Sequence, residues 1–376
     1  MEIPFAESPR STVGLEWELM LADGETGGLV PAAPGILQLL EGGEKITAEL
    51  LTNTIEVTSD PRERIADAIN DLRGRIAAVR HEAERHNVKL LTSGSHPFAK
   101  WQDQNITEKS RYRTLIDRAQ WWGRNLMIWG IHMHIGVDDG AKVIPIVSEL
   151  TRYLPHFEAL SASSPFWAGE QTGYASNRAL VFQQLPTAGL PWQLPDWAAF
   201  EGYVDDLIGT GVISEVTELR WDIRPAPRWG TVELRACDSV SNTFEFAAIA
   251  ALAQSLVEWF SRRLDDGETF EPLQPWFHRE NKWRAARYGM DVQVIVDRSG
   301  RELGVRDHLG ELLPVLEPIA DDLGCRAELA GIRTILDLGA GYQRQLAVAQ
   351  QSDGDLTAVV KHLIAEFDAE RPLPVR

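Results

Sequence analysis

The sequence has few cysteines and, relative to its acidic residues, few lysines and arginines. Two cysteines, Cys237 and Cys325, lie far apart among 376 residues and in no metal-binding spacing. They favour free buried thiols in a reducing compartment over a disulfide framework. The 37 basic residues face 55 acidic ones, which gives a formal charge of −18. This excess argues against nucleic acid or an anionic membrane surface as the main partner.

Membrane and export signals are also missing from the sequence. No uncharged apolar run approaches transmembrane length, and the first ten residues lack the basic and apolar stretches of a signal peptide. We therefore expect a cytoplasmic protein. The length suggests two or three domains, but the candidate site residues run from Glu16 to Glu233 and must meet in one place. We therefore predict a single catalytic domain, residues 1–376.

The most informative segment is Thr12–Met20, T-V-G-L-E-W-E-L-M. Side chains alternate between the faces of a strand, so Glu16 and Glu18 share one face while the apolar residues between them bury the other. Like charges repel, and no lysine or arginine lies close by in sequence. A cation held beside both carboxylates explains the pair; a solvated polar face is the alternative.

The same design recurs in two further segments. In Ile131–Val137, His132 and His134 share one face, and in Thr231–Ala236 the pair is Glu233 and Arg235. A lone histidine in a strand is more often a hydrogen-bonded core residue than a ligand. Three strands of this kind together predict one sheet whose polar face is an active site.

The remaining pattern places helices around this sheet. We expect Glu218–Arg224 to be a strand that leads through a proline-containing turn into the Glu233 strand as an antiparallel hairpin. Asn242 and Glu245 predict a capping box for a helix that ends near Leu264, and most of the chain from Trp276 onward reads as helical. The expected class is α+β, an antiparallel or mixed sheet backed by helices.

The polar-face residues form a set of metal-ligand type. Carboxylates dominate it, with one or two imidazoles, so it favours Mg²⁺ or Mn²⁺ over structural zinc. Its size suits two or three ions, which commonly hold ATP phosphates. The metal candidates are Glu16, Glu18, Glu56, His132 and Glu233, with Glu49 as a further candidate.

Arginines supply candidate anion contacts. Arg235 lies on the same face as Glu233 and could touch the γ-phosphate, while Arg224 and Arg178 are candidates for carboxylate or phosphate recognition. The sequence contains neither a Walker-type glycine loop nor a Rossmann fingerprint. Nucleotide binding would therefore depend on metal ions and the sheet.

An ordered set of motifs resembles a known family. V-G-L-E-W-E, G-I-H-M-H-I-G, T-G-Y-A-S-N-R, V-E-L-R and N-K-W-R-A-A-R-Y-G (Asn281–Gly289) follow one another over most of the chain. This set resembles glutamate–cysteine ligases of the second type, or YbdK-type carboxylate–amine ligases, in the glutamine synthetase superfamily. The resemblance implies a curved, mainly antiparallel sheet, a partial barrel, with helices on its convex side.

The resemblance also implies roles for individual residues. Glu16 and Glu18 would bind metal, and Glu49 and Glu56, seven apart, would complete a metal site. Because an odd separation places the last two on opposite faces of a regular strand, a bend or bulge must lie between them. The other implied roles are metal ligation by His132, contact with the nucleotide phosphates by His134, metal bridging by Glu233 and contact with the transferred phosphate by Arg235.

The implied reaction joins two small molecules, and relatives of this type often form homodimers. ATP would phosphorylate the γ-carboxylate of glutamate, and an amine such as that of cysteine would attack the acyl phosphate. No protein nucleophile is needed. The alternatives are a ligase of the same superfamily with another acid, amine or protein acceptor, a metal-dependent hydrolase that needs no nucleotide, and a non-catalytic nucleotide-binding homologue.

Two segments leave their roles open. The irregular stretch 163–195 is expected to shape the amine pocket, although the sequence does not select the amine. The arginines of Asn281–Gly289 follow a helical pattern and could either reach the site or lie on a solvated face.

Overall fold

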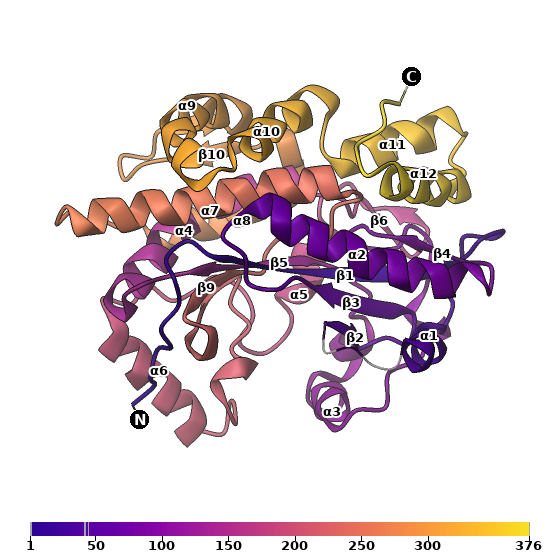
Figure 1. The fold of residues 1–376 in the computed structure, drawn as a ribbon, viewed down its shortest axis with the longest axis horizontal. Coiled ribbons are helices and arrows are strands. Elements are labelled where there is room, and N and C mark those ends of the chain that lie inside the picture. The colour runs from indigo at the N-terminus through magenta and orange to yellow at the C-terminus, as the bar shows by residue number, and fades with distance from the viewer. Residues whose placement is uncertain (1, 41–42, 44, 376) are drawn as a thin grey trace.

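The computed structural model describes residues 2–40, 43 and 45–375, and its centre is one seven-stranded sheet (Figure 1). The strand order is β2–β3–β1–β5–β9–β8, with β4 paired to the far part of β1, and the pairings are antiparallel. The described strands form an open sheet, so the expected α+β class with an unclosed antiparallel sheet is confirmed. The strands of this sheet are β1 (Val13–Asp23), β2 (Ile46–Ala48), β3 (Thr54–Thr58), β4 (Val88–Leu91), β5 (Ile131–Gly136), β8 (Ile223–Ala226) and β9 (Thr231–Leu234). Two separate hairpins contain β6 (Phe166–Trp167) with β7 (Glu170–Gln171) and β10 (Gln293–Ile295) with β11 (Glu302–Gly304).

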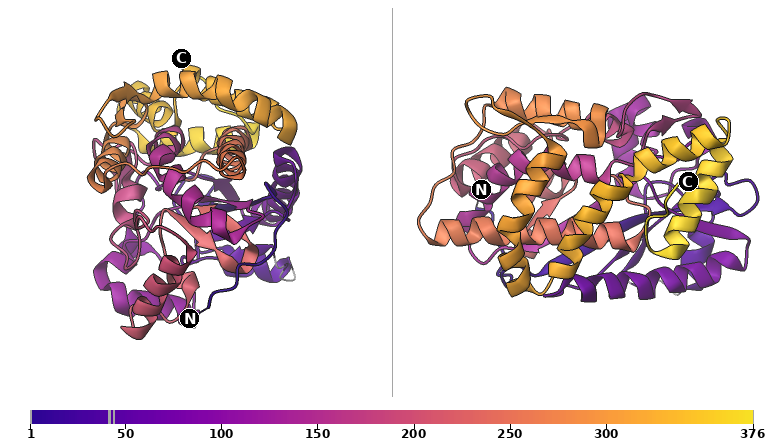
Figure 2. Two further views of the ribbon diagram at one scale, coloured as in Figure 1. Left: turned by 90° about the vertical axis from the view of Figure 1, so that its left-hand side faces the viewer. Right: turned by 90° about the horizontal axis from the view of Figure 1, so that it is seen from above.

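Helices cover one face of the sheet in two layers. The first layer contains α2 (Ile65–Glu84), α4 (Gly140–Ser161), α7 (Thr243–Asp265) and α8 (Pro275–Tyr288). The C-terminal helices lie above it, as the view from above in Figure 2 shows, and they confirm the expected helical C-terminal part. These are α9 (Val305–Leu323), α10 (Arg326–Leu338), α11 (Gly341–Gln351) and α12 (Leu356–Ala369).

The opposite face of the sheet is only partly covered. Further helices and loops lie below the sheet in Figure 1. These helices are α1 (Ala33–Leu39), α3 (Ser110–Arg124), α5 (Asn177–Phe182) and α6 (Trp197–Gly209). Among them, α3 and α5 contribute residues to a pocket described below. Among the described helices, none is long and apolar enough to cross a membrane.

The buried side of the sheet follows the predicted alternation. Val13, Leu15, Trp17 and Leu19 of β1 are at most 1% exposed, and the apolar residues of β5 and β9 are buried beside them. The Trp17 indole N–H donates to Ser239 (2.9 Å), and its ring packs edge-on against Phe246 of α7 (5.4 Å). One cluster of buried apolar residues extends from Val13 to Phe367, so the sheet and the helical layers share a core.

One expected strand is misplaced. Glu218–Arg224 does not form a strand: a 3₁₀ turn covers Val216–Glu218, and β8 begins only at Ile223. Leu219 and Trp221 are buried as the alternation suggests, but they pack against α6 in a separate apolar cluster. Packing against a helix produced the same alternation that a strand would show. The hairpin itself is confirmed, because β8 pairs antiparallel with β9.

A buried ion network joins α7 to the C-terminal helices. The Asn242 side chain accepts from the Glu245 N–H (2.9 Å), which confirms the predicted start of α7. Arg344 of α11 then donates to Glu245 (2.7 Å) and to Glu366 of α12 (2.6 Å). All three side chains are at most 2% exposed. Arg344 is therefore the buried cation that both carboxylates share, while His362 also lies 3.2 Å from Glu366.

We expect Arg344→Met to lower the free energy of unfolding by about 3–5 kcal/mol, because two buried carboxylates lose their cation. Urea unfolding measures the change. Arg333→Met is the control: its ion pair with Glu317 is exposed, and its loss should cost less than about 1 kcal/mol. Equal losses in both variants would contradict the role assigned to Arg344.

Candidate active site

Polar residues of five neighbouring strands form one row across the open face of the sheet. On β1, Glu18 pairs with Glu56 of β3, and Glu16 pairs with His132 of β5. Further along, Glu233 of β9 lies opposite His134 of β5 on one side and Arg224 of β8 on the other. The backbone register therefore brings together residues that are up to about 200 positions apart in sequence.

Two groups in this row have the spacing of metal ligands. One is Glu16, Glu56 and His132, and the other is Glu16, His134 and Glu233; within each group one ligand atom per residue lies within 4.8 Å of the others. Glu16 belongs to both groups. His134 belongs to the second group, and its contact with the nucleotide phosphates remains a prediction.

Glu16 is held by both imidazoles. Its carboxylate lies 2.9 Å from Nδ1 of His132 and 3.4 Å from Nε2 of His134. Burial opposes ionisation of Glu16, but hydrogen bonds from the two histidines outweigh it and lower its pKa. Burial and the nearby Arg235 lower the pKa of His132 to about 4, so His132 is neutral at pH 7, as a metal ligand must be.

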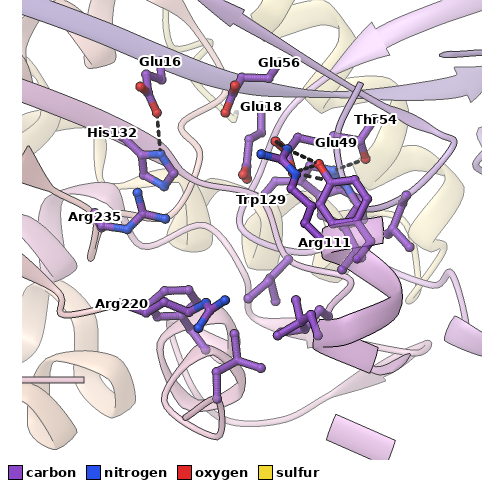
Figure 3. Close-up of a pocket in the computed structure, with 18 of the residues that line it drawn as sticks. Glu16, Glu18, Glu49, Thr54, Glu56, Arg111, Trp129, His132, Arg220 and Arg235 are labelled. Atoms are coloured by element: carbon purple, nitrogen blue, oxygen red, sulfur yellow. Dashed lines mark hydrogen bonds and ion pairs between the residues drawn. The ribbon is translucent and has the colours of Figure 1, made fainter. Parts of the chain in front are cut away.

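Among the described residues, the ion pairs around the site involve Glu16, Glu49 and Glu233 but neither Glu18 nor Glu56, and Figure 3 marks no interaction at these two carboxylates. Burial, followed by repulsion from Glu49, raises the pKa of Glu18 to about 7. Burial, followed by repulsion from Glu49, Glu16 and Glu18, raises the pKa of Glu56 well above its ordinary value. The Gly130 N–H donates to Glu18 at 2.6 Å. A bound cation would relieve this repulsion.

Glu49 lies in the turn between β2 and β3, so the required bend is a complete chain reversal. Its carboxylate accepts from the Tyr112 hydroxyl (3.2 Å), lies 3.6 Å from Arg111, and is outside both ligand groups. It lines the same pocket as Glu18 and Glu56, and Figure 3 shows it next to Glu18. Its metal role remains a prediction.

Glu233 is the most strongly neutralised member of the row. It is 1% exposed and accepts from Arg224 Nε (2.6 Å) and from Arg235. Burial opposes its ionisation, but Arg235, Arg224 and His134 outweigh burial and lower its pKa. Glu233 therefore positions two guanidinium groups beside the ligand groups.

Two pockets flank this row and share Glu16, Thr217, Arg224 and Arg235 in their walls. The first, of about 590 Å³, is lined by Glu16, Glu18, Glu49 and Glu56 and by a set of apolar residues, the apolar wall. That wall includes Leu50, Leu115, Leu126, Ile128, Phe182 and Leu185. The second, of about 400 Å³, contains His134, Glu233 and the largely apolar segment 225–229.

Arg178 lines the first pocket, but its terminal nitrogens donate to main-chain oxygens of Arg235 (3.0 Å) and Ala236 (3.1 Å). It thus holds the chain that carries Arg235. The guanidinium lies against Gly130, where a Cβ atom would overlap it. Its substrate role remains a prediction, and the rest of the 163–195 stretch contributes Phe182 and Leu185 to this pocket.

The Asn281–Gly289 motif stabilises the fold instead of lining the two pockets. The Asn281 side chain bonds both the N–H and the C=O of Ile295 (2.8 and 2.9 Å). Lys282 forms a buried ion pair with Asp222 (2.5 Å), whose main-chain oxygen accepts from the Arg235 N–H (2.8 Å). The motif therefore connects α8 to the chain on both sides of β8 and β9.

Sequence reasoning assigned no role to several pocket residues. Lys109, Arg111, Tyr112 and Arg220 all line the first pocket. Lys109 precedes α3, and Arg111 and Tyr112 lie in its first turn. The alternation that marked the site residues of the strands does not extend to this helix, so it could not indicate these three residues. Arg220 shares its alternation with Arg224, and that was the available signal.

We expect Gly130→Ala to lower the free energy of unfolding by about 1–3 kcal/mol, because the added methyl group would displace Arg178 from its carbonyl partners. Urea unfolding tests this. Gly74→Ala is the control, since a Cβ atom there meets nothing within 4 Å. If the Gly130 variant is as stable as that control, Arg178 can move away from the added methyl group without lowering the free energy of unfolding.

Comparisons with known proteins agree with this geometry. The model of the glutamate-cysteine ligase family 2 matches residues 12–362. Proteins named "Putative glutamate--cysteine ligase 2" from Leifsonia xyli and Mycobacterium tuberculosis are 56% and 50% identical, each over 97% of this chain and over 98% and 97% of their own.

Solved structures share the fold. A glutamate–cysteine ligase from Francisella tularensis in complex with AMP has a TM-score of 0.69 at 15% identity, covering 96% of this chain and 90% of that one. The match of the family model over nearly the whole length is the decisive finding. The chain therefore belongs to the glutamate-cysteine ligase family 2.

Proposed function

We propose that this protein is an ATP-dependent carbon–nitrogen ligase that forms γ-glutamylcysteine from glutamate and cysteine through a γ-glutamyl phosphate. The observation that carries the proposal is the single row from Glu56 to Arg224, which combines carboxylates, imidazoles and guanidinium groups on one open face. A hydrolase would use the carboxylates and histidines but would leave Arg224 and Arg235 without a task.

The donor set fits two or three Mg²⁺ or Mn²⁺ ions. Oxygen ligands dominate, thiolates are absent from the row, and unpaired carboxyls with raised pKa values lie side by side. The two ligand groups that share Glu16 would hold two ions, and Glu18 with Glu49 would complete the set. When bound, the ions would neutralise charge on the phosphates.

The two pockets divide the substrates. We assign the nucleotide to the second pocket, where the apolar segment 225–229 can contact a base and His134 lies near the phosphates. Glutamate and the amine would occupy the first pocket. Arg235 lines both pockets, so its guanidinium can contact the phosphate as it moves from the nucleotide to the acid.

The chain's contribution is positioning and charge, without covalent catalysis. Burial raises the pKa of Cys237 to about 12 and that of Cys325 to about 11, so neither thiol is a nucleophile at neutral pH. Arg224 and Arg178 would hold carboxylate or phosphate oxygens, and the apolar wall would limit hydrolysis of the acyl phosphate by water.

Three further proposals concern the whole protein. The shared core supports one catalytic unit over residues 1–376, although the structure describes 2–40, 43 and 45–375. Two buried free cysteines support a cytoplasmic location. The family resemblance supports a homodimer, whereas the charge of −18 disfavours nucleic acid and anionic membranes as partners.

The test of the proposed reaction is ADP release with Mg²⁺, ATP and glutamate against a panel of amines. We expect release that requires both glutamate and an amine, with cysteine giving the highest kcat/KM. Glu233→Gln should reduce ADP formation by at least about 100-fold, because two guanidinium groups lose their anionic partner at the site.

Circular dichroism of Glu233→Gln should show a folded protein, since glutamine keeps the side-chain shape. Absence of ADP with every acid and amine would refute the ligase proposal. Cleavage of γ-glutamylcysteine by water without nucleotide would favour the hydrolase instead.

Stabilisation by Mg²⁺ should increase as pH rises from about 5.5 to 8. Without metal, the raised pKa of Glu18, about 7, means that its protonated form is stabilised by folding. This stability is fully present below the carboxyl's ordinary pKa and is lost as pH rises through 7. Mg²⁺ binds the ionised form of Glu18, so binding releases a proton wherever this carboxyl is protonated in the metal-free protein. The apparent affinity for Mg²⁺ should therefore increase by up to about tenfold for each pH unit in this range.

Thermal unfolding with and without Mg²⁺ at several pH values measures this effect. Glu18→Gln is the matched variant and should flatten the dependence. A Mg²⁺-induced shift that does not change with pH would argue against metal binding at Glu18.

A further inference from the structure

The cations around the first pocket differ in how their charges are satisfied. Arg224 and Arg235 pair with Glu233, and Arg111 lies 3.6 Å from Glu49. Arg178 uses both terminal nitrogens on main-chain oxygens. Of the described arginines in this wall, Arg220 is the one whose side chain has neither a carboxylate partner within ion-pair distance nor more than one hydrogen bond.

That single bond goes from Arg220 to the main-chain oxygen of Glu218 (3.0 Å). The two acids nearest in sequence are each two positions away: Glu218 directs its carboxylate to the Ser214 N–H (2.7 Å), and Asp222 pairs with Lys282 (2.5 Å). Both leave the Arg220 guanidinium without an ion pair. The backbone position is well determined, because the Arg220 N–H donates to Thr187 (3.3 Å) and Trp221 bridges to Gly189. The half-buried side chain is therefore held at the pocket without a protein anion.

The local field adds to this imbalance. Burial lowers the pKa of Arg220, and after a partly compensating effect of Glu218, repulsion from Arg235, Arg224 and Arg118 lowers it further. An anionic ligand would remove this cost. Figure 3 shows Arg220 on the opposite side of the pocket from Glu18 and Glu56.

The position distinguishes a carboxylate from a phosphate. Arg224 and Arg235 line both pockets, but Arg220 lines only the first of these two, across from the residues of metal-ligand type. A phosphate bound with metal ions belongs near the acidic row. The planar fork of an arginine suits bidentate contact with a carboxylate, and the apolar residues that line the same pocket suit an uncharged side chain.

We propose that Arg220 is a specificity-determining residue that binds the α-carboxylate of an amino-acid substrate in the first pocket. The inference rests on the proposed ligase function, and the carboxylate can belong to either the acid donor or the amine acceptor. Arg220 thereby restricts that substrate to α-amino acids and excludes the corresponding decarboxylated amine. It acts in substrate binding, separately from the transfer of the phosphate at Arg235.

Matched substrate pairs test the proposal. Glutamate and 4-aminobutyrate differ by the α-carboxylate of the donor, and cysteine and cysteamine differ by that of the acceptor. In the unaltered enzyme, kcat/KM should favour the carboxylate-bearing member of each pair. In Arg220→Met, this preference should fall by about 10- to 100-fold in one pair, through KM, with the KM for ATP unchanged. Arg220→Lys should retain part of it.

Arg118→Met is the charge-matched control. Arg118 lies close enough to Arg220 to affect its pKa but is absent from both pocket walls, so both preferences should persist in this variant. The pair that loses its preference identifies the source of the carboxylate. Unchanged preferences in both pairs, or an effect on ATP alone, would overturn the proposal.

A binding measurement separates this inference from the reaction itself. Calorimetric titration of glutamate and cysteine into protein with Mg²⁺ and a non-hydrolysable ATP analogue needs no turnover. We expect one of the two affinities to fall by about 10- to 100-fold in Arg220→Met. If the enzyme makes no ADP but this loss is seen, the ligase function fails and the carboxylate site stands; equal affinities in both proteins overturn the site.

Discussion

The register of β1 between β3 and β5 is the constraint on which the site depends. It places Glu18 opposite Glu56 and Glu16 opposite His132, while Trp17 between the two acids is buried beneath the sheet. A slip of one residue would exchange the two faces of the strand and bury both acids. The apolar face thus determines where the carboxylates lie, because its packing against α7 selects one register.

The buried carboxylates of the site differ in how many basic partners they have. Glu233 receives two guanidinium groups and Glu16 two imidazoles, whereas Glu18 and Glu56 receive no basic partner among the described residues. A fold selected for stability alone would pair or remove such carboxyls. Under the proposed function, these carboxyls would bind cations on one wall of the pocket, and Arg220 across it would bind an anion.

Local patterns succeeded where one face of a strand had to be apolar. The alternation in β1, β5 and β9 indicated both the buried face and the row of ligand-type residues, and the Asn242 cap marked the start of α7. The same reasoning misplaced β8, because Leu219 and Trp221 alternate to pack on α6. Alternation of apolar and polar residues indicates that one side of a segment is buried, but it does not show whether a sheet or a helix buries that side.

The sequence by itself determined the ligand types, their strands and the face on which they lie, since side-chain alternation is a property of the local backbone. Only the tertiary structure decided how they are grouped. It placed His134 with Glu16 and Glu233, put Glu49 in a turn, directed Arg178 to main-chain oxygens and left Arg220 unpaired. These outcomes depend on the register and packing between segments distant in the chain, and no local pattern encodes them.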